Sequence, residues 1–218
     1  VPVGSLLNKL LFAVKYQEQR ILLSNLINKD SKILFERNPR ERVSKVAPWL
    51  TLDGDPYPAI VDGKIQWIID GYTTSASYPY SQTTTLSTAT TDALTTNSAA
   101  VTAQANRNVN YIRNSVKATV DAYDGTVTLY QWDEKDPVLK TWMKAFPGTV
   151  TAKNKISADL LNHIRYPEDL FRVQRDVLSS YHVKTADAFY GGQDFWRVPR
   201  DPSTFGANAS AQPPYYLT

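Results

Sequence analysis

The sequence contains no cysteine, one methionine and only two histidines. Without cysteine the chain has no disulfide, no thiol nucleophile and no thiolate ligand for zinc. His163 and His182 do not form the H-x-x-x-H pair that helical zinc sites use. We therefore predict no metal site.

The motifs of the common enzyme classes are also missing. The sequence has no G-x-S-x-G, no glycine-rich phosphate loop and no dinucleotide-binding fingerprint. We predict no catalytic residue and no cofactor, and an enzyme is the less favoured interpretation.

Long apolar runs and a strong net charge are absent too. No stretch offers the roughly 18 uninterrupted apolar residues that would cross a membrane. The formal net charge of +3 is too small a surplus for a nucleic-acid binder by itself, so we predict no nucleic-acid partner.

Apolar residues make up 42% of the chain, which is enough for a hydrophobic core. Because the chain starts at Val1 without methionine, we expect it to be an excised piece.

The basic residues are concentrated in the N-terminal part. Residues 1–47 hold nine Lys or Arg against four Asp or Glu. Such a segment suits weak contact with anionic lipid headgroups or with an acidic partner. An ordinary solvated helix surface is the simpler interpretation.

Residues 3–27 have the apolar spacing of a helix. Apolar residues recur at intervals of three and four: Leu6, Leu7, Leu10, Leu11 and Val14, and then Ile21, Leu22, Leu23, Leu26 and Ile27. The pattern predicts a helix that packs its apolar side on the core, with a helix lying on a membrane surface as the alternative.

Two Asp-Gly pairs lie between runs of strand-forming residues. Asp62-Gly63 separates residues 59–61 from residues 64–70, and Asp124-Gly125 separates residues 115–123 from residues 126–132. An Asp-Gly pair favours a tight hairpin turn, because both turn residues need positive φ. We predict an α+β fold in which an antiparallel sheet is built on the two hairpins, with helices from both ends of the chain packed on it.

Capping residues predict further helices after Asn38, Asp136, Ser157, Pro167 and Thr185.

The segment Thr83–Asn106 is rich in Thr, Ser and Ala and has few large apolar groups, so we expect a mobile insertion there. Residues 1–200 then form a single domain, and residues 201–218 form an extended arm or linker, because they are rich in Pro and Gly.

Aromatic side chains near an acid form the candidate binding site: Trp67, Asp70, Tyr72, Tyr78 and Tyr80. Rigid aromatic rings with a polar atom are common at recognition surfaces. The simpler interpretation places Trp67 and at least one tyrosine in the core. Asp53, Asp55 and Asp70 are the acids that a hydrolase would use, although turn chemistry explains Asp53-Gly54-Asp55 better than a calcium site does.

Four stretches of the chain resemble a known family: residues 37–82, residues 110–150, RYPEDLFRVQRDVLSSYHV and the closing QPPYYLT. Together they are similar to uncharacterised protein family 0182, a family of large bacterial integral membrane proteins with no assigned activity. The resemblance covers nearly the whole chain and departs mainly in Thr83–Asn106. It implies that the chain is part of a soluble extracytoplasmic region, attached at the cell membrane to the rest of its parent protein.

A second resemblance is local. The segment KATVDAYDGTV is similar to the hairpin of PepSY domains, which are small exported modules. Taken together, these features lead us to expect an extracytoplasmic binding or interaction module with a protein, peptide or envelope ligand. The alternatives are an envelope-acting hydrolase and a structural scaffold for the transmembrane part.

Overall fold

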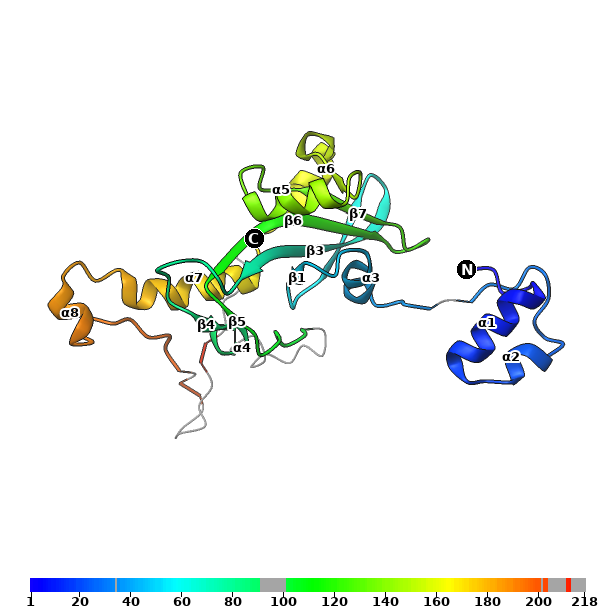
Figure 1. The fold of residues 1–218 in the computed structure, drawn as a ribbon, viewed down its shortest axis with the longest axis horizontal. Helices are drawn as coiled ribbons and strands as arrows, with labels where there is room; N and C mark the ends of the chain where they lie inside the picture. The colour runs from blue at the N-terminus through cyan, green and yellow to red at the C-terminus, as the bar shows by residue number, and fades with distance from the viewer. Residues whose placement is uncertain (34, 91–100, 201, 204–210, 213–218) are drawn as a thin grey trace.

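The computed structural model describes residues 1–33, 35–90, 101–200, 202–203 and 211–212. It shows a mixed α+β fold with a mostly antiparallel sheet (Figure 1). The strands are β1 (Thr51–Leu52), β2 (Tyr57–Val61), β3 (Lys64–Ser75), β4 (Thr84–Thr85), β5 (Asn108–Val109), β6 (Tyr111–Asp121), β7 (Val127–Gln131) and β8 (Val150–Thr151). The helices of four residues or more are α1 (Leu6–Tyr16), α2 (Arg20–Leu23), α3 (Pro39–Val46), α4 (Leu86–Ala89), α5 (Pro137–Ala145), α6 (Ala158–His163), α7 (Glu168–Tyr181) and α8 (Ala186–Tyr190).

The main sheet has the strand order β1-β3-β6-β7-β8, and β2 also pairs with β3. All of these pairs are antiparallel except β7 with β8. The long strands β3 and β6 form its centre, where their register shifts between Gly71 and Tyr72. At this bulge Gly71 lies opposite Val116 and Tyr72 lies opposite Asn114, so Ser115 is the additional residue of β6.

The turns of the two Asp-Gly segments differ. Val61 pairs with Lys64, so Asp62 and Gly63 alone connect β2 to β3, with φ of 49° and 75°. The prediction of a second turn of the same kind was wrong, because five residues connect β6 to β7. In that loop the Asp121 carboxylate accepts the N–H groups of Tyr123 and Asp124, and Arg42 Nη1 donates to Gly125 O at 2.9 Å. The loop between β6 and β7 is therefore longer than a two-residue turn, and the Asp121 side chain and Arg42 of α3 stabilise it.

Helices cover both faces of the sheet. On one face, Val43 and Ala47 from the α3 region and Leu139 of α5 pack with Ile69 and the alternate residues of β6. On the other face, Leu160 of α6 packs with Ile68, Tyr57, Val61 and Ile156. The predicted caps of α3 and α5 are confirmed, because Asn38 and Asp136 accept the first free N–H groups of their helices.

The N-terminal helix differs from its prediction. The structure has two helices, because Gln17 takes a left-handed conformation with φ of 53° and ends α1, after which the apolar spacing is interrupted by polar residues. Pro2 bridges to Lys32, so the chain returns on itself and pairs α1 with α2. Figure 1 shows this helical pair apart from the sheet, and the prediction that its leucines pack on the core was wrong.

The predicted insertion at Thr83–Asn106 is partly regular in structure. Strand β4 pairs with β5, and Leu86 and Ala89 of α4 are buried with Val109 and Val173 of α7. Residues 91–100, and most of the predicted arm at 201–218, lie outside the described residues. Within the described residues, no helix has both the length and the apolar character needed to cross a membrane.

Candidate functional site

A buried ion pair lies at the centre of the sheet. Asp70 of β3 and Lys117 of β6 are direct cross-strand partners, and Lys117 Nζ contacts Asp70 Oδ1. The two residues are 3% and 1% exposed. Burial raises the pKa of Asp70, while the Lys117 ammonium and the hydrogen bonds from Lys117 and Asn114 oppose that rise. The pair is therefore held by mutual neutralisation, with almost no exposed surface of its own.

The bulge in β6 places Asn114 beside this pair. Asn114 Nδ2 donates to Asp70 Oδ1 at 2.9 Å, so the amide nitrogen faces the carboxylate. Asn114 is only 9% exposed, and its Oδ1 has no hydrogen-bond partner. A buried acceptor without a partner costs free energy, because it has lost water and gained nothing in return. A ligand that donates a hydrogen bond to Oδ1 would recover this cost.

Asn114 and Lys117 also line a surface pocket of about 600 Å³. Its walls come from β6, the end of β7, α6 and the start of α7, and its other lining residues include Trp132, Arg113, Arg165, Tyr166 and Leu170. Two ammonium groups contact the Trp132 ring, with Lys117 Nζ at 5.2 Å and Lys153 Nζ at 4.4 Å from its centre. We call this cavity the Asn114 pocket.

Hydrogen bonds fix the floor and rim of the Asn114 pocket. Lys117 Nζ donates to the Arg165 carbonyl at 3.1 Å, and Arg165 N donates to Tyr57 Oη at 3.0 Å. The Arg165 guanidinium lies 4.6 Å from the Tyr57 ring centre. Arg113 Nη2 pairs with Asp133 Oδ2 at 2.6 Å. The pocket thus combines one oriented acceptor with aromatic rings and cationic groups.

Next to the pocket, the loop after β1 holds the N-terminus of α7. The residue that precedes α7 is Pro167, which offers no side-chain cap. Asp53 Oδ2 accepts the N–H of Asp169 at 3.1 Å, and Tyr72 Oη, which donates to Asp53, accepts the N–H of Leu170 at 3.3 Å. In return, Asp169 Oδ2 accepts the N–H of Gly54 at 2.8 Å. Residues 116 and 98 positions away in the sequence therefore cap the helix.

Asp53 of this loop and Asp169 of α7 are buried rather than presented to solvent, while Asp55 is partly buried. Asp53 is 2% exposed, and burial together with the neighbouring Asp169 carboxylate raises the pKa of Asp53 to about 7. Asp169 is also bonded to Arg172, whose Nη1 lies 3.0 Å from Asp169 Oδ1, and to Gln104. A carboxyl with such a pKa suits proton transfer, but the oxygens of Asp53 are engaged by Tyr72, Asp55 and Asp169.

The five predicted site residues do not share one surface. Trp67 packs against the core on the face that α3 and α5 cover, while Asp70 points to the opposite face. Asp70 and Tyr72 both lie buried behind the Asn114 pocket. Tyr78 is half-exposed and stacks on Tyr111 at 5.7 Å, and Tyr80 is fully exposed. Their role in ligand binding stays a prediction.

Sequence reasoning missed Asn114 and Lys117. Val116, Ala118 and Val120 alternate with Lys117, and because a half-buried strand exposes every second residue, this pattern alone gives no reason to bury Lys117. The available signal was the acid at Asp70 in an otherwise apolar strand, which needs a buried partner. The position of Asn114 could not be found, because it depends on the bulge.

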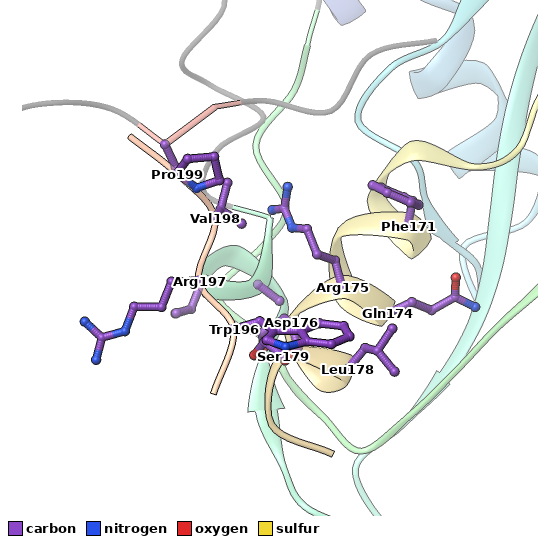
Figure 2. Close-up of a pocket in the computed structure, with 13 residues that line it drawn as sticks. Phe171, Gln174, Arg175, Asp176, Leu178, Ser179, Trp196, Arg197, Val198 and Pro199 are labelled. Atoms are coloured by element: carbon purple, nitrogen blue, oxygen red, sulfur yellow. Dashed lines mark hydrogen bonds between the residues drawn. The ribbon is translucent and has the colours of Figure 1, made fainter. Parts of the chain in front are cut away.

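A second pocket, of about 890 Å³, lies between α7 and the segment Trp196–Pro199 (Figure 2). Phe171, Leu178 and Trp196 contribute apolar wall, and His182 stacks on Trp196 at 3.8 Å. This pocket offers apolar area, whereas the Asn114 pocket offers an oriented polar atom. Over the described part of the chain, no group of three or more His, Cys, Asp or Glu side chains is placed to hold a metal ion.

The fold and the pocket describe an α+β domain with a polar surface cavity. The whole chain, residues 1–218, matches the model of the Uncharacterised protein family (UPF0182), and the chain belongs to that family. It is 60% identical to a UPF0182 protein of Thermobifida fusca over 218 residues, which is all of this chain and 21% of that protein. No solved structure matches the chain.

Other relatives have a similar sequence identity to this chain, and the chain again covers only about a fifth of their length. A UPF0182 protein of Kineococcus radiotolerans is 60% identical over 222 residues, which covers 22% of that protein. One from Bifidobacterium longum is 54% identical over 219 residues, which covers 99% of this chain and 20% of that protein. The chain therefore spans about a fifth of the length of these curated relatives and corresponds to part of a larger protein.

Proposed function

We propose that this chain is a binding or interaction module of a larger membrane protein and that it works on the extracytoplasmic side. The family relationship supports the larger protein, since the relatives are about five times as long as the chain. The membrane location and its side come from the resemblance to large integral membrane proteins. The binding role is argued from the Asn114 pocket.

The observation that carries the proposal is a surface pocket of about 600 Å³ whose lining includes Asn114, a residue whose buried Oδ1 has no hydrogen-bond partner. Because this oxygen is covered in the free chain, the ligand reaches it with an N–H or O–H group after a small shift of the Asn114 side chain. Its less polar part lies against Trp132 and Leu170, because ligand sites combine apolar walls with a few placed polar groups. Peptide amides and the hydroxyl groups of envelope saccharides both have this chemistry.

A hydrolase is the rival function, and the raised pKa of Asp53 is the observation that favours it. Asp53 and Asp70 are both nearly inaccessible, and both serve hydrogen bonds within the chain. A hydrolase using Asp53 would show a pH–rate profile with a break near pH 7 on peptide or cell-wall substrates. Absence of turnover on a broad panel would eliminate this rival and leave binding or a scaffold role.

Thermal unfolding against peptides, envelope saccharides, nucleotides and metals tests the binding proposal. A ligand present at about 100 times its dissociation constant adds roughly 2.7 kcal/mol if it binds only the folded chain. We expect a saturable rise in Tm with a peptide or a saccharide. The rise is expected to disappear in Asn114→Ala and to persist in Tyr80→Ala, a variant of the exposed tyrosine outside the Asn114 pocket.

Three outcomes separate the alternatives. A ligand-dependent rise that Tyr80→Ala abolishes and Asn114→Ala retains moves the site to the tyrosine surface. A rise that neither variant changes contradicts both sites. No rise with any compound contradicts a small-ligand site and favours the structural scaffold.

A further inference from the structure

The apolar side of α1 faces away from the protein. Leu6, Leu7 and Val14 are 76%, 65% and 70% exposed, and Leu10 and Leu11 on the same face are also exposed. These five residues form what we call the leucine face. The same helical pair exposes Leu23 and Leu26. Monomeric soluble proteins rarely leave such a group uncovered, so the leucine face marks a contact surface.

The other side of α1 is already occupied within the chain. Phe12 is buried and packs edge-on against Phe35, with ring centres 5.5 Å apart. Lys9 Nζ donates to the Ile27 carbonyl at 2.7 Å, which ties α1 to the segment after α2. The leucine face thus points outward because the helix is fixed by its opposite side.

The charge around the leucine face indicates what covers it. The exposed charged residues of the helical pair and its return segment include four cations and two acids: Lys15, Arg20, Lys29 and Lys32, with Glu18 and Asp30. A leucine face on a segment with a cationic surplus is the pattern of a helix that lies at an anionic lipid surface. A neutral protein groove would complement the leucines but not the cations.

The length of α1 determines how the helix would sit. Its 11 residues span about 16 Å, since an α-helix rises about 1.5 Å per residue. The hydrocarbon core of a bilayer is about 30 Å thick. We propose that α1 lies in the plane of an anionic membrane, with the leucine face among the acyl chains and the lysines and arginine at the headgroups.

Flotation with vesicles tests this proposal on the 218-residue chain. One set of vesicles is neutral phosphatidylcholine, and the other contains about 30 mol% phosphatidylglycerol. We expect the chain to bind the anionic vesicles at least ~10-fold more tightly than the neutral ones. Raising the salt from about 0.1 M to about 0.5 M is expected to weaken that binding, because salt screens exposed charges.

Variants distinguish the two parts of the surface. Leu7→Gln with Leu11→Gln is expected to weaken binding at least ~10-fold, since it removes apolar area that enters the membrane. Ile60→Gln is the matched control, because Ile60 is 66% exposed on β2 and lies outside the leucine face. Arg20→Gln with Lys29→Gln and Lys32→Gln should lower binding to anionic vesicles only. Circular dichroism of each variant establishes that the fold is intact.

Three results would overturn the proposal: no vesicle binding, equal binding to neutral and anionic vesicles, or unchanged binding of the leucine variant. Sedimentation of the chain alone gives the competing answer. If the chain self-associates without lipid and the leucine variant does not, the leucine face is an interface between copies. None of these results bears on the Asn114 pocket, so this inference stands or falls apart from the proposed function.

Discussion

At the scale of single residues, the buried ion pair of Lys117 and Asp70 limits which substitutions the centre of the sheet tolerates. Both side chains are buried, and each is the other's charge partner. Removal of one partner leaves a charge in a medium of low dielectric constant, which costs far more than the loss of an exposed pair. Exposed ion pairs elsewhere on the chain, such as Lys64 with Asp121, have water as a substitute.

We expect Lys117→Met to lower the free energy of unfolding by about 3 to 5 kcal/mol, because Asp70 then lacks its buried counter-charge. Urea denaturation measures the change. Lys64→Met is the matched control, since Lys64 is largely exposed, and it should cost under about 1 kcal/mol. Adding Asp70→Asn to Lys117→Met should restore part of the loss. Equal losses for Lys117→Met and Lys64→Met would contradict the buried ion pair.

Gly54 is required by close packing. A Cβ at this position would lie 2.5 Å from the Thr102 carbonyl oxygen and 3.3 Å from Asp169 Oδ2. Because the nearer atom is backbone, Gly54→Ala should destabilise the chain by about 1 to 3 kcal/mol in chemical denaturation. Gly63→Ala gives the contrast, since nothing lies within 4 Å there and its cost comes from the positive φ alone. A neutral Gly54→Ala would show that the loop does not press against Thr102.

At the scale of elements, α7 depends on the loop after β1. The helix begins at Glu168 behind a proline, and Asp53 and Tyr72 accept its free N–H groups. Glu168 and Asp169 in its first turn also pair with Arg172 one turn later. The loop, β3 and α7 are thus joined by one hydrogen-bonded unit that lies beside the Asn114 pocket.

This unit gives the fold a pH dependence. The pKa of Asp53 is about 7 in the folded chain and near 3.8 when unfolded, so between these values the folded chain holds a proton that the unfolded chain has lost. The contribution of Asp53 to stability therefore falls as the pH rises from about 4 to about 7. We expect the free energy of unfolding of the wild type, relative to Asp53→Asn, to decrease over that range. Denaturation at several pH values measures it, and a difference that stays constant with pH would contradict the raised pKa.

At the scale of the whole molecule, the chain combines a helix-covered sheet with a helical pair at its N-terminal end (Figure 1). The sheet holds the Asn114 pocket, and the helical pair holds the leucine face. Glu36 connects the two parts, since its carboxylate pairs with Lys15 of α1 and with Lys45 of α3. A single chain therefore presents a polar pocket and an apolar, cationic surface, one for each of the two proposals made above.

Local features of the sequence determined many of the elements. Asn38, Asp136 and the Pro167 segment began helices where they were expected, because caps and proline act within one turn of the chain. The mixed α+β class followed from strand-forming runs between these helices. Of the five predicted site residues, Asp70 contacts Asn114 and Lys117 of the pocket lining, and the role of all five in binding stays a prediction.

Tertiary structure alone decided which way the side chains face. The bulge at Ser115 brought Asn114 beside Asp70, and long-range pairing buried Lys117 in the lining of the pocket. In α1 the same leucine spacing suits a core or a membrane, and the side that Phe12 and Lys9 occupy turned it outward. The spacing of apolar residues determines that a helix or strand has an apolar face, because that spacing involves only residues close together in the sequence. What a face contacts depends on residues far away in the chain, and only the folded molecule brings those together.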